Sequence, residues 1–194
     1  HASTNATMPR VVVVGASFAG LYAAKGLRSV ADVVLIDASD EWEYTPAVHE
    51  VLGGRRKPNT ILTSFTETLP GVEFIRGVAV AAHESEVHVE LRDGSIKKVP
   101  YDHLIIAVGC SYARPIKAAL KSSDRRAQLA GAQSELRDAS SVLVVGGGAV
   151  GVAAAIISSS CRGLMNERYV KWVEGAAGAL AGFVSGPRAL LRAW

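Results

Sequence analysis

The sequence predicts an α/β fold with parallel sheets, in which the same order of strand, glycine turn and helix occurs twice. The first copy begins with the β-branched run Val11–Val14, followed by a glycine-rich turn and helix-forming residues at 18–28. The second copy is the segment 141–157, SVLVVGGGAVGVAAAII. A continuous apolar run is typical of a strand buried on both faces of a parallel sheet. The chain of 194 residues is long enough to bury such sheets in a core.

The composition is that of an ordinary globular protein, with 49% hydrophobic residues, 20% charged residues and a formal net charge of +3. The basic residues are scattered, so nucleic acid binding is not expected. Cys110 and Cys161 have no CxxC pair and no histidine at ligand spacing, so the sequence supports neither a zinc site nor a disulfide framework. No apolar run reaches the roughly 18 residues of a membrane span, and residues 1–10 do not resemble a secretory signal. We therefore expect a cytoplasmic protein.

The first copy continues as a β-α-β crossover. A second apolar run at Val33–Ile36 ends at Asp37 and predicts the second buried strand. Residues 41–70 are less periodic, and we expect a loop there with one or two short helices. Trp42 and Tyr44 in this loop could flank a quinone or cover the edge of the sheet, and we favour the second role.

Further strands are predicted between the two copies. The segment 72–80 predicts one strand, and 86–102 alternates apolar and polar residues around Asp93-Gly94, which is typical of an antiparallel hairpin. The apolar segment 103–109 predicts another buried strand that ends in glycine. A polar segment at 117–139 predicts a helix.

The first glycine turn has the spacing of a dinucleotide-binding loop. In such loops the first glycine makes the tight turn, the second lets the backbone approach a pyrophosphate, and the third allows close helix packing. Gly15 and Gly20 occupy the outer positions, and Ser17 occupies the middle one, where its hydroxyl could donate to a phosphate or cap the helix. Asp37 is placed to accept hydrogen bonds from ribose hydroxyls. The small residues could instead serve tight packing alone, but the strand, helix and acid together favour a nucleotide.

The second glycine turn fits the full pattern with Gly146, Gly148 and Gly151. The next strand is expected at 169–175. The helix after the turn runs into a serine-rich segment that is poor helix-forming sequence. We therefore expect an incomplete nucleotide-binding domain, with a divergent or disordered tail from about residue 153.

Two such units, the second following a hairpin and a strand ending in IIAVG, resemble the flavoproteins with two dinucleotide-binding domains. Within that family, residues 11–52 and 126–152 are similar to the apoptosis-inducing-factor-2-like and type II NADH dehydrogenase branch. Enzymes of that branch pass electrons from NAD(P)H through FAD to a quinone. The segment 101–111 is similar to the family's linker between the two domains, with Val108 where the family has threonine.

The resemblance implies a fold class, domains and a reaction. A Rossmann-like FAD-binding domain, with a parallel sheet and a small antiparallel hairpin or meander, is expected at 9–113. A partial Rossmann-like NAD(P)-binding unit is expected at 114–194. The cofactors would be FAD and NAD(P)H, and the partner a quinone-like small molecule. Hydride transfer is the chemistry of the cofactors, so no catalytic side chain and no metal is expected. Membrane association of a longer parent stays open.

The resemblance also implies roles for single residues. The residues expected to line the FAD pyrophosphate are Gly15, Ala16, Ser17, Phe18, Ala19 and Gly20. Asp37 would bind the adenosine ribose, and the backbone near Val78 and Ala79 would meet the adenine. Ala107 and Gly109 would approach the cofactor where the chain crosses between domains. The residues expected to hold the NAD(P)H pyrophosphate are Gly146, Gly148 and Gly151.

The chain also departs from the family. No close cysteine pair follows the second strand, which excludes the disulfide-reductase branch. Family members are longer and contain a Gly-Asp pair that binds the ribityl chain of the flavin, whereas this sequence has no Gly-Asp dipeptide. We therefore expect a truncated oxidoreductase with low or no activity alone.

Two other functions are retained as alternatives. The chain could be a non-catalytic nucleotide-binding or interaction module. It could also be an NAD(P)-dependent enzyme with a single cofactor, although the second glycine loop and the lack of a Tyr-x-x-x-Lys pair argue against this.

Overall fold

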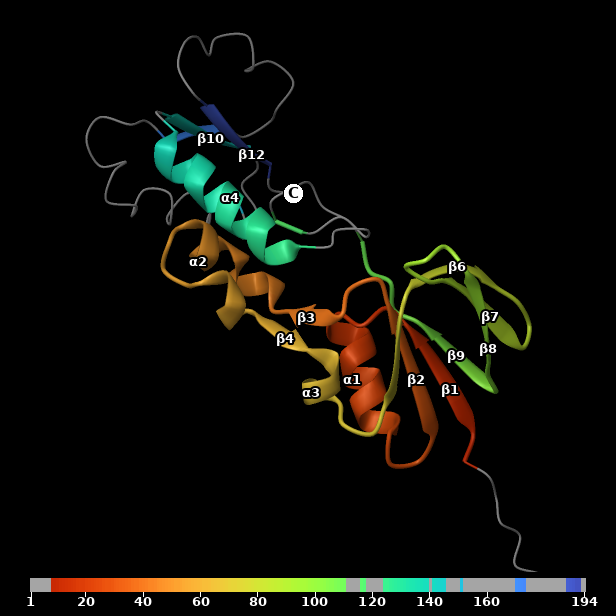
Figure 1. Cartoon of the computed structure of the whole chain (residues 1–194). Coiled ribbons are helices and arrows are strands. Elements are labelled where there is room, and N and C mark those ends of the chain that lie inside the picture. The colour runs from red at the N-terminus through yellow and green to blue at the C-terminus, as the bar shows by residue number, and fades with distance from the viewer. Residues whose placement is uncertain are drawn as a thin grey trace, which may run out of the picture. The chain divides into compact units, whose positions relative to one another are not determined.

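The computed structural model describes residues 8–110, 116–117, 124–139, 141–145, 151, 170–173 and 188–192. These residues belong to two compact units (Figure 1). The first unit contains the described residues up to Glu43 and those from Leu62 to Cys110. The second contains Tyr44–Ile61 and the remaining described residues. The domain boundary expected at residues 113 and 114 stays a prediction.

The first unit is built on a parallel sheet of four strands in the order β5-β2-β1-β9. The strands are β1 (Arg10–Val14), β2 (Asp32–Asp37), β5 (Glu73–Arg76) and β9 (His103–Ile106). Helix α1 (Phe18–Leu27) connects β1 to β2. The β-α-β crossover predicted from the two apolar runs is therefore confirmed.

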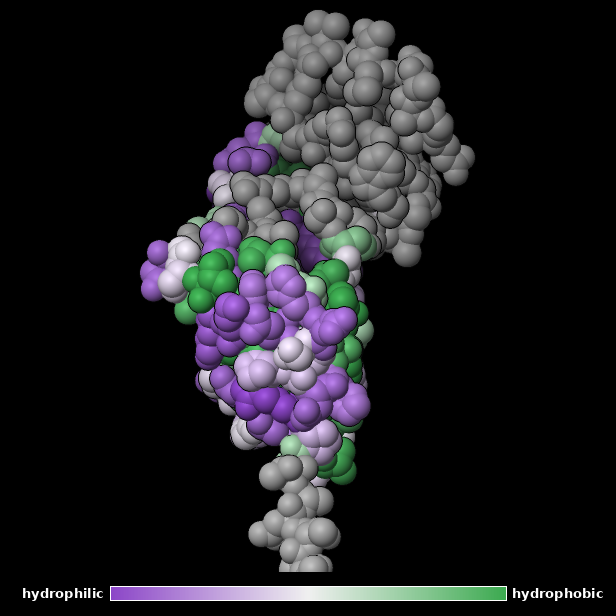
Figure 2. All heavy atoms as spheres, turned by 90° about the vertical axis from the view of Figure 1, so that its right-hand side faces the viewer, coloured by the Kyte–Doolittle hydropathy of each residue, from purple (hydrophilic) through white to green (hydrophobic). Residues whose placement is uncertain are grey.

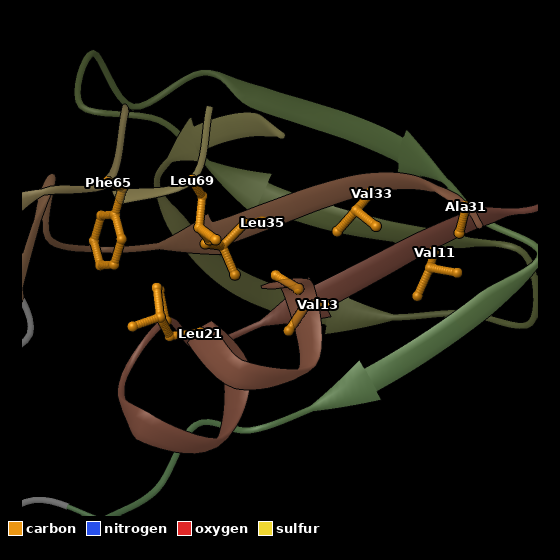
Figure 3. Packing of buried hydrophobic residues seen from close by; sticks show 10 residues of the cluster. Val11, Val13, Leu21, Ala31, Val33, Leu35, Phe65 and Leu69 are labelled. Carbon is orange, nitrogen blue, oxygen red and sulfur yellow. The ribbon is translucent and has the colours of Figure 1, made fainter. Parts of the chain in front are cut away.

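The side chains of the apolar runs in β1 and β2 are buried on both faces of this sheet, because successive residues of a strand point to opposite faces. The odd-numbered residues pack with side chains of α1 and of the short helix α3 (Phe65–Thr68). Figure 3 shows the members Val11, Val13, Leu21, Ala31, Val33, Leu35, Phe65 and Leu69. The even-numbered residues of the two strands belong to a second cluster of buried side chains, which contains Val12, Val14, Val34 and Ile36.

The second cluster is closed by a small antiparallel sheet, which confirms the predicted hairpin. Its strands are β6 (Val78–Ala82), β7 (Glu86–Glu90) and β8 (Ile96–Pro100). Val87 and Val89 of β7 pack inward, and the alternating residues Glu86, His88 and Glu90 are half-buried. On the side that carries these strands, the coloured residues of Figure 2 are mostly hydrophilic, as expected for an antiparallel sheet with one solvated face.

The single strand predicted at 72–80 is two strands in two different sheets. The chain leaves the parallel sheet after β5, passes Gly77 and enters the antiparallel sheet as β6. A Cβ at Gly77 would lie 2.5 Å from Cγ1 of Val89 and 2.8 Å from the carbonyl oxygen of Glu90. The break therefore occurs at a residue where only glycine lets the two sheets approach this closely.

The prediction that 103–109 is a buried strand is half wrong. The strand exists as β9, but Ile106 is 66% exposed and Val108 is 60% exposed. In the part of the chain that the structure describes, β9 pairs with β1 and lies at the edge of its sheet. Apolar sequence predicts a strand, whereas its burial depends on the neighbours that the fold supplies.

The segment 41–70 is more ordered than predicted. In the first unit, β3 (Glu41–Glu43) pairs with β4 (Leu62–Ser64) in antiparallel fashion. The second unit contains the short helix α2 (Val48–Leu52), in line with the expected helices. It also contains two 3-10 turns, η1 (Thr45–Ala47) and η2 (Pro58–Thr60). The paired strands were missed because three residues carry too little periodicity to be recognised.

The second unit contains a parallel sheet of three strands in the order β11-β10-β12. They are β10 (Ser141–Val145), β11 (Val170–Val173) and β12 (Arg188–Arg192). Helix α4 (Arg125–Asp138) precedes them, and the Asp124 carboxylate caps it by accepting a first-turn N–H at 2.9 Å. The predicted helix, the strand near 170 and the α/β fold class are confirmed; β12 was not predicted. Among the described residues no helix is long and apolar enough to cross a membrane.

Candidate functional site

The candidate site lies in the first unit, where three parallel strands end at the same edge of the sheet. β1 lies between β2 and β9, and its last residue is in register with Ile36 and with Ile106. Gly15, Asp37 and Ala107 therefore meet at the carboxyl ends of these strands. In open α/β sheets this edge is where ligands bind.

Gly15 is required by the backbone at this edge. Its φ angle is +95°, a conformation that favours glycine. A Cβ on Gly15 would lie 2.4 Å from the carbonyl oxygen of Ala107 and 2.9 Å from Cα of Val108. The Gly15 N–H donates to the carbonyl of Ile36 at 2.8 Å. The turn is thus held between its two neighbouring strands.

Gly20 is required by the close approach of helix α1 to the loop. A Cβ on Gly20 would lie 1.7 Å from the carbonyl oxygen of Gly15 and 3.3 Å from Cγ1 of Val13. The protein's own packing therefore explains both outer glycines. The argument for a ligand depends on the polar groups that surround the loop.

The N-terminus of α1 supplies the first of these groups. Ser17 is the N-cap residue, and its side chain makes no capping hydrogen bond, so the capping role left open by the sequence is not observed. The first turn, which includes Phe18 and Ala19, contains no acidic residue. The N–H groups at the start of a helix are unpaired within it and attract anions. This helix end therefore suits a phosphate group.

Asp37 supplies the second polar group. Its Oδ2 accepts the N–H of Ala16 at 2.7 Å, and its Oδ1 accepts the N–H of Ser39 at 2.8 Å. The side chain is half-buried, whereas Ala16 is 1% exposed. Each carboxylate oxygen retains capacity for a second hydrogen bond, as a ribose hydroxyl would need. Asp37 also binds the loop itself, which its spacing in the sequence did not reveal.

Two further residues near the loop were not singled out as binding residues from the sequence. Trp42 packs against the ring of Phe18 edge-on, with the ring centroids 5.4 Å apart, so it contacts the glycine loop. Arg76 forms an ion pair with Asp40, in the turn that follows Asp37. The sequence offered no signal for Arg76, because it lies 39 positions from Asp37 and meets it only through strand pairing.

The other residues predicted to contact FAD are Ala79, in strand β6, and Gly109, after strand β9. The N–H of Gly77 donates to the carbonyl of Asp37 at 2.9 Å, so the start of β6 lies beside the end of β2. Ala79, two residues further on, is half-buried and packs against the second core cluster. Gly109 follows Ala107 with a φ of +64° and is exposed.

The second predicted loop is described only at its ends. Strand β10 ends at Val145, directly before the loop, and Gly151 is helical and buried. Gly146 and Gly148 lie outside the described residues. Across the described residues no group of three or more His, Cys, Asp or Glu side chains could hold a metal ion.

Residues 9–184 match the model of a family described as pyridine nucleotide-disulphide oxidoreductase. Ferroptosis suppressor protein 1 of Taeniopygia guttata is 32% identical over 152 residues, which are 74% of this chain and 38% of that protein. The alternative NAD(P)H-ubiquinone oxidoreductase C1, chloroplastic/mitochondrial, of Arabidopsis thaliana is 30% identical over 123 residues, which are 52% of this chain and 23% of that protein.

Solved structures share the fold. NDH2 from Plasmodium falciparum in complex with NADH matches with a TM-score of 0.68 at 16% identity, over 87% of this chain and 42% of that one. The match shows a common fold. The chain spans well under half the length of each of these relatives.

Proposed function

Because the chain belongs to the pyridine nucleotide-disulphide oxidoreductase family, we propose that it forms part of an FAD-dependent enzyme that oxidises NAD(P)H. The family consists of enzymes that bind FAD and NAD(P)H. The acceptor we propose is a quinone-type small molecule, since one relative is named an NAD(P)H-ubiquinone oxidoreductase.

The observation that carries this proposal is the convergence of Gly15, Asp37 and Ala107 at one edge of the parallel sheet. A Cβ at Gly15 would fill the space that the crossover carbonyl of Ala107 occupies, so only glycine lets the loop and the crossover segment approach this closely. The first turn of α1 contains no acidic side chain, and Asp37 adds an acceptor beside the loop. These groups fit the pyrophosphate and ribose of FAD.

The parts of FAD would contact different residues at this edge of the sheet. The pyrophosphate would contact the loop residues Gly15, Ala16, Ser17, Phe18, Ala19 and Gly20. Asp37 would accept hydrogen bonds from the adenosine ribose, and the backbone around Ala79 would meet the adenine. Ala107 and Gly109 would approach the cofactor as the chain leaves β9.

Bound FAD would supply the redox chemistry, by taking hydride from NAD(P)H and passing electrons to the acceptor. The residues of this chain bind and orient. The start of α1 offsets the negative charge of the pyrophosphate, and Asp37 fixes the ribose. Gly15 lets the loop pack against the crossover segment at Ala107, and Gly20 lets helix α1 pack against the loop. No side chain is required to transfer a proton in the hydride step.

For NAD(P)H, we propose the loop that contains Gly146, Gly148 and Gly151. Strand β10 supports this assignment, because it ends directly before the loop and has parallel strands on both sides. Strand β1 has the same relation to the first loop. The two glycine loops would therefore occupy equivalent positions in two sheets of the same kind.

We expect this chain alone to turn over NAD(P)H slowly or not at all. Its sequence has no Gly-Asp dipeptide of the kind that binds the ribityl chain in the family it resembles. Rapid NADH oxidation by the purified chain would contradict this part of the proposal.

The test is to incubate the purified chain with FAD, remove free FAD by gel filtration, and record the visible flavin absorbance. NADH is then added under anaerobic conditions. Retained flavin absorbance that bleaches with NADH would support both nucleotide assignments. A colourless protein that gains thermal stability from ADP would favour the alternative of a non-catalytic nucleotide-binding module. A protein that takes up neither FAD nor ADP would overturn the assignment of the first loop.

A further inference from the structure

We propose that Arg76 is a positioning residue, which holds the first glycine loop in its binding shape through the turn at 38–40 and through Asp37. Arg76 itself would not touch the nucleotide. Its effect on FAD binding rests on the function proposed above, whereas its effect on the loop does not.

The proposed link from Arg76 to the loop is a relay of two steps. In the first step, Arg76 binds the turn at 38–40. Arg76 is the last residue of β5 and is in register with Asp37 of β2. Its guanidinium pairs with the carboxylate of Asp40, and its Nε donates to the carbonyl of Ala38 at 3.4 Å. The side chain is only 20% exposed. Arg76 therefore binds the two residues that flank Ser39.

The second step runs from the turn to the loop. The N–H of Ser39 donates to Oδ1 of Asp37 at 2.8 Å, and Oδ2 of Asp37 accepts the N–H of Ala16 at 2.7 Å. Ala16 is almost fully buried, so its N–H would lose its acceptor if the carboxylate turned away. The orientation of Asp37 therefore couples the turn to the backbone of the glycine loop.

Arg76 shares the task of ordering this turn with local contacts. The hydroxyl of Ser39 also donates to the carbonyl of Glu41 at 2.9 Å. Asp40 is 55% exposed, and ion pairs with an exposed partner are weak. We therefore expect removal of Arg76 to raise the equilibrium constant for local opening of the loop by about two- to five-fold, and not to unfold the chain.

Arg10 provides a matched control at the opposite end of the same strands. Its guanidinium pairs with Asp32 at 2.6 Å and with Glu73 at 2.9 Å, and it is 32% exposed. Asp32 begins β2 and Glu73 begins β5, whereas Arg76 acts where these strands end. Arg10→Ala thus removes ion pairs from the same sheet without touching the turn or the loop.

The first experiment measures amide hydrogen exchange by NMR in the chain without nucleotide. Arg76→Ala should accelerate exchange at Ala16 and Ser39 by about two- to five-fold and leave Val34, in the sheet, unchanged. Arg76→Lys keeps a positive charge beside Asp40, so its exchange rates at Ala16 and Ser39 should lie between those of the parent chain and those of Arg76→Ala. Arg10→Ala should not accelerate the two loop amides. Unchanged exchange in Arg76→Ala, or equal acceleration in the Arg10 variant, would overturn the proposal.

The second experiment measures FAD affinity by the quenching of flavin fluorescence. Arg76→Ala should raise the Kd about two- to five-fold, and this factor should fall to near one in the Asp37→Asn background, because the relay passes through Asp37. An undiminished factor in that background would refute the relay. If the parent chain binds no FAD while Arg76→Ala still accelerates loop exchange, the proposed function fails and the positioning role stands.

Discussion

Two glycines of helix α1 should respond in opposite ways to the same substitution. Gly20 faces the glycine loop, where a Cβ would lie 1.7 Å from the carbonyl oxygen of Gly15 and 2.9 Å from its carbonyl carbon. Gly26 lies in the same helix, is exposed, and has open space where a Cβ would stand. Alanine at Gly20 must therefore displace backbone, whereas alanine at Gly26 displaces nothing.

The magnitudes follow from these two environments. Overpacking a well-packed site costs about 1–3 kcal/mol, and a backbone obstacle cannot rotate away, so we expect about 3 kcal/mol for Gly20→Ala. Gly26→Ala replaces a poor helix former by the best one and should stabilise by about 0.5–1 kcal/mol. The free energies of unfolding of the two variants should thus differ by about 4 kcal/mol.

Urea unfolding followed by far-UV circular dichroism tests this prediction. The midpoint should fall for Gly20→Ala and rise slightly for Gly26→Ala relative to the parent chain. Equal midpoints for the two variants would show that α1 does not press on the loop in this way, and the explanation of the third glycine of the pattern would then be lost.

Three other predictions follow from the same structure. Gly15→Ala should cost more than about 3 kcal/mol, because its Cβ would meet a backbone carbonyl at 2.4 Å and sit at a φ of +95°. Gly94→Ala, at a φ of +83° in open space, should cost only about 1–2 kcal/mol. Similar melting temperatures for the Gly15 and Gly94 variants would contradict the clash between a Cβ at Gly15 and the carbonyl of Ala107. Asp37→Asn should cost about 1–3 kcal/mol, because an amide NH₂ would face a backbone N–H; an unaltered unfolding midpoint would argue against that geometry. The pKa of Glu86 is lowered, chiefly by its hydrogen bond with His88, so this pairing stabilises the fold above the unfolded carboxyl's pKa and is lost as the pH falls through the lowered value. NMR titration should find the Glu86 midpoint below that of an ordinary glutamate, and an ordinary midpoint would refute the pairing.

The parts of the fold that local patterns specify were predicted correctly. The valine run of β1, the small-residue helix α1 and the second apolar run of β2 are where they were expected. The hairpin around Asp93-Gly94 is also present. In each case a short segment carries its own signal, because its periodicity or its turn residues specify the local conformation.

Predictions that depended on neighbours were less successful. The segment 72–80 has uniform strand character, yet it is divided at Gly77, because two sheets approach each other there. The apolar strand β9 was expected in the interior and lies at an edge. The strands β3 and β4 pair across the intervening residues 44–61, which a scan along the chain cannot detect.

The same division applies to the candidate site. Gly15, Gly20 and Asp37 follow a spacing that is visible in the sequence, and the structure gives two of them a measurable steric reason. The packing of Trp42 on Phe18 and the link from Arg76 to the turn arise only when separate strands are brought into register. The roles of these residues toward FAD and NAD(P)H remain predictions.

The sequence by itself determined the α/β class, the two glycine turns and the family resemblance, because strand runs, turn glycines and their spacing are local properties of the chain. Only the tertiary structure decided which residues surround the first turn. Parallel pairing aligned the ends of β1, β2, β5 and β9, and this alignment brought Ala107 against Gly15 and Arg76 beside Asp37. Contacts between residues far apart in the chain depend on strand register, which no single segment encodes.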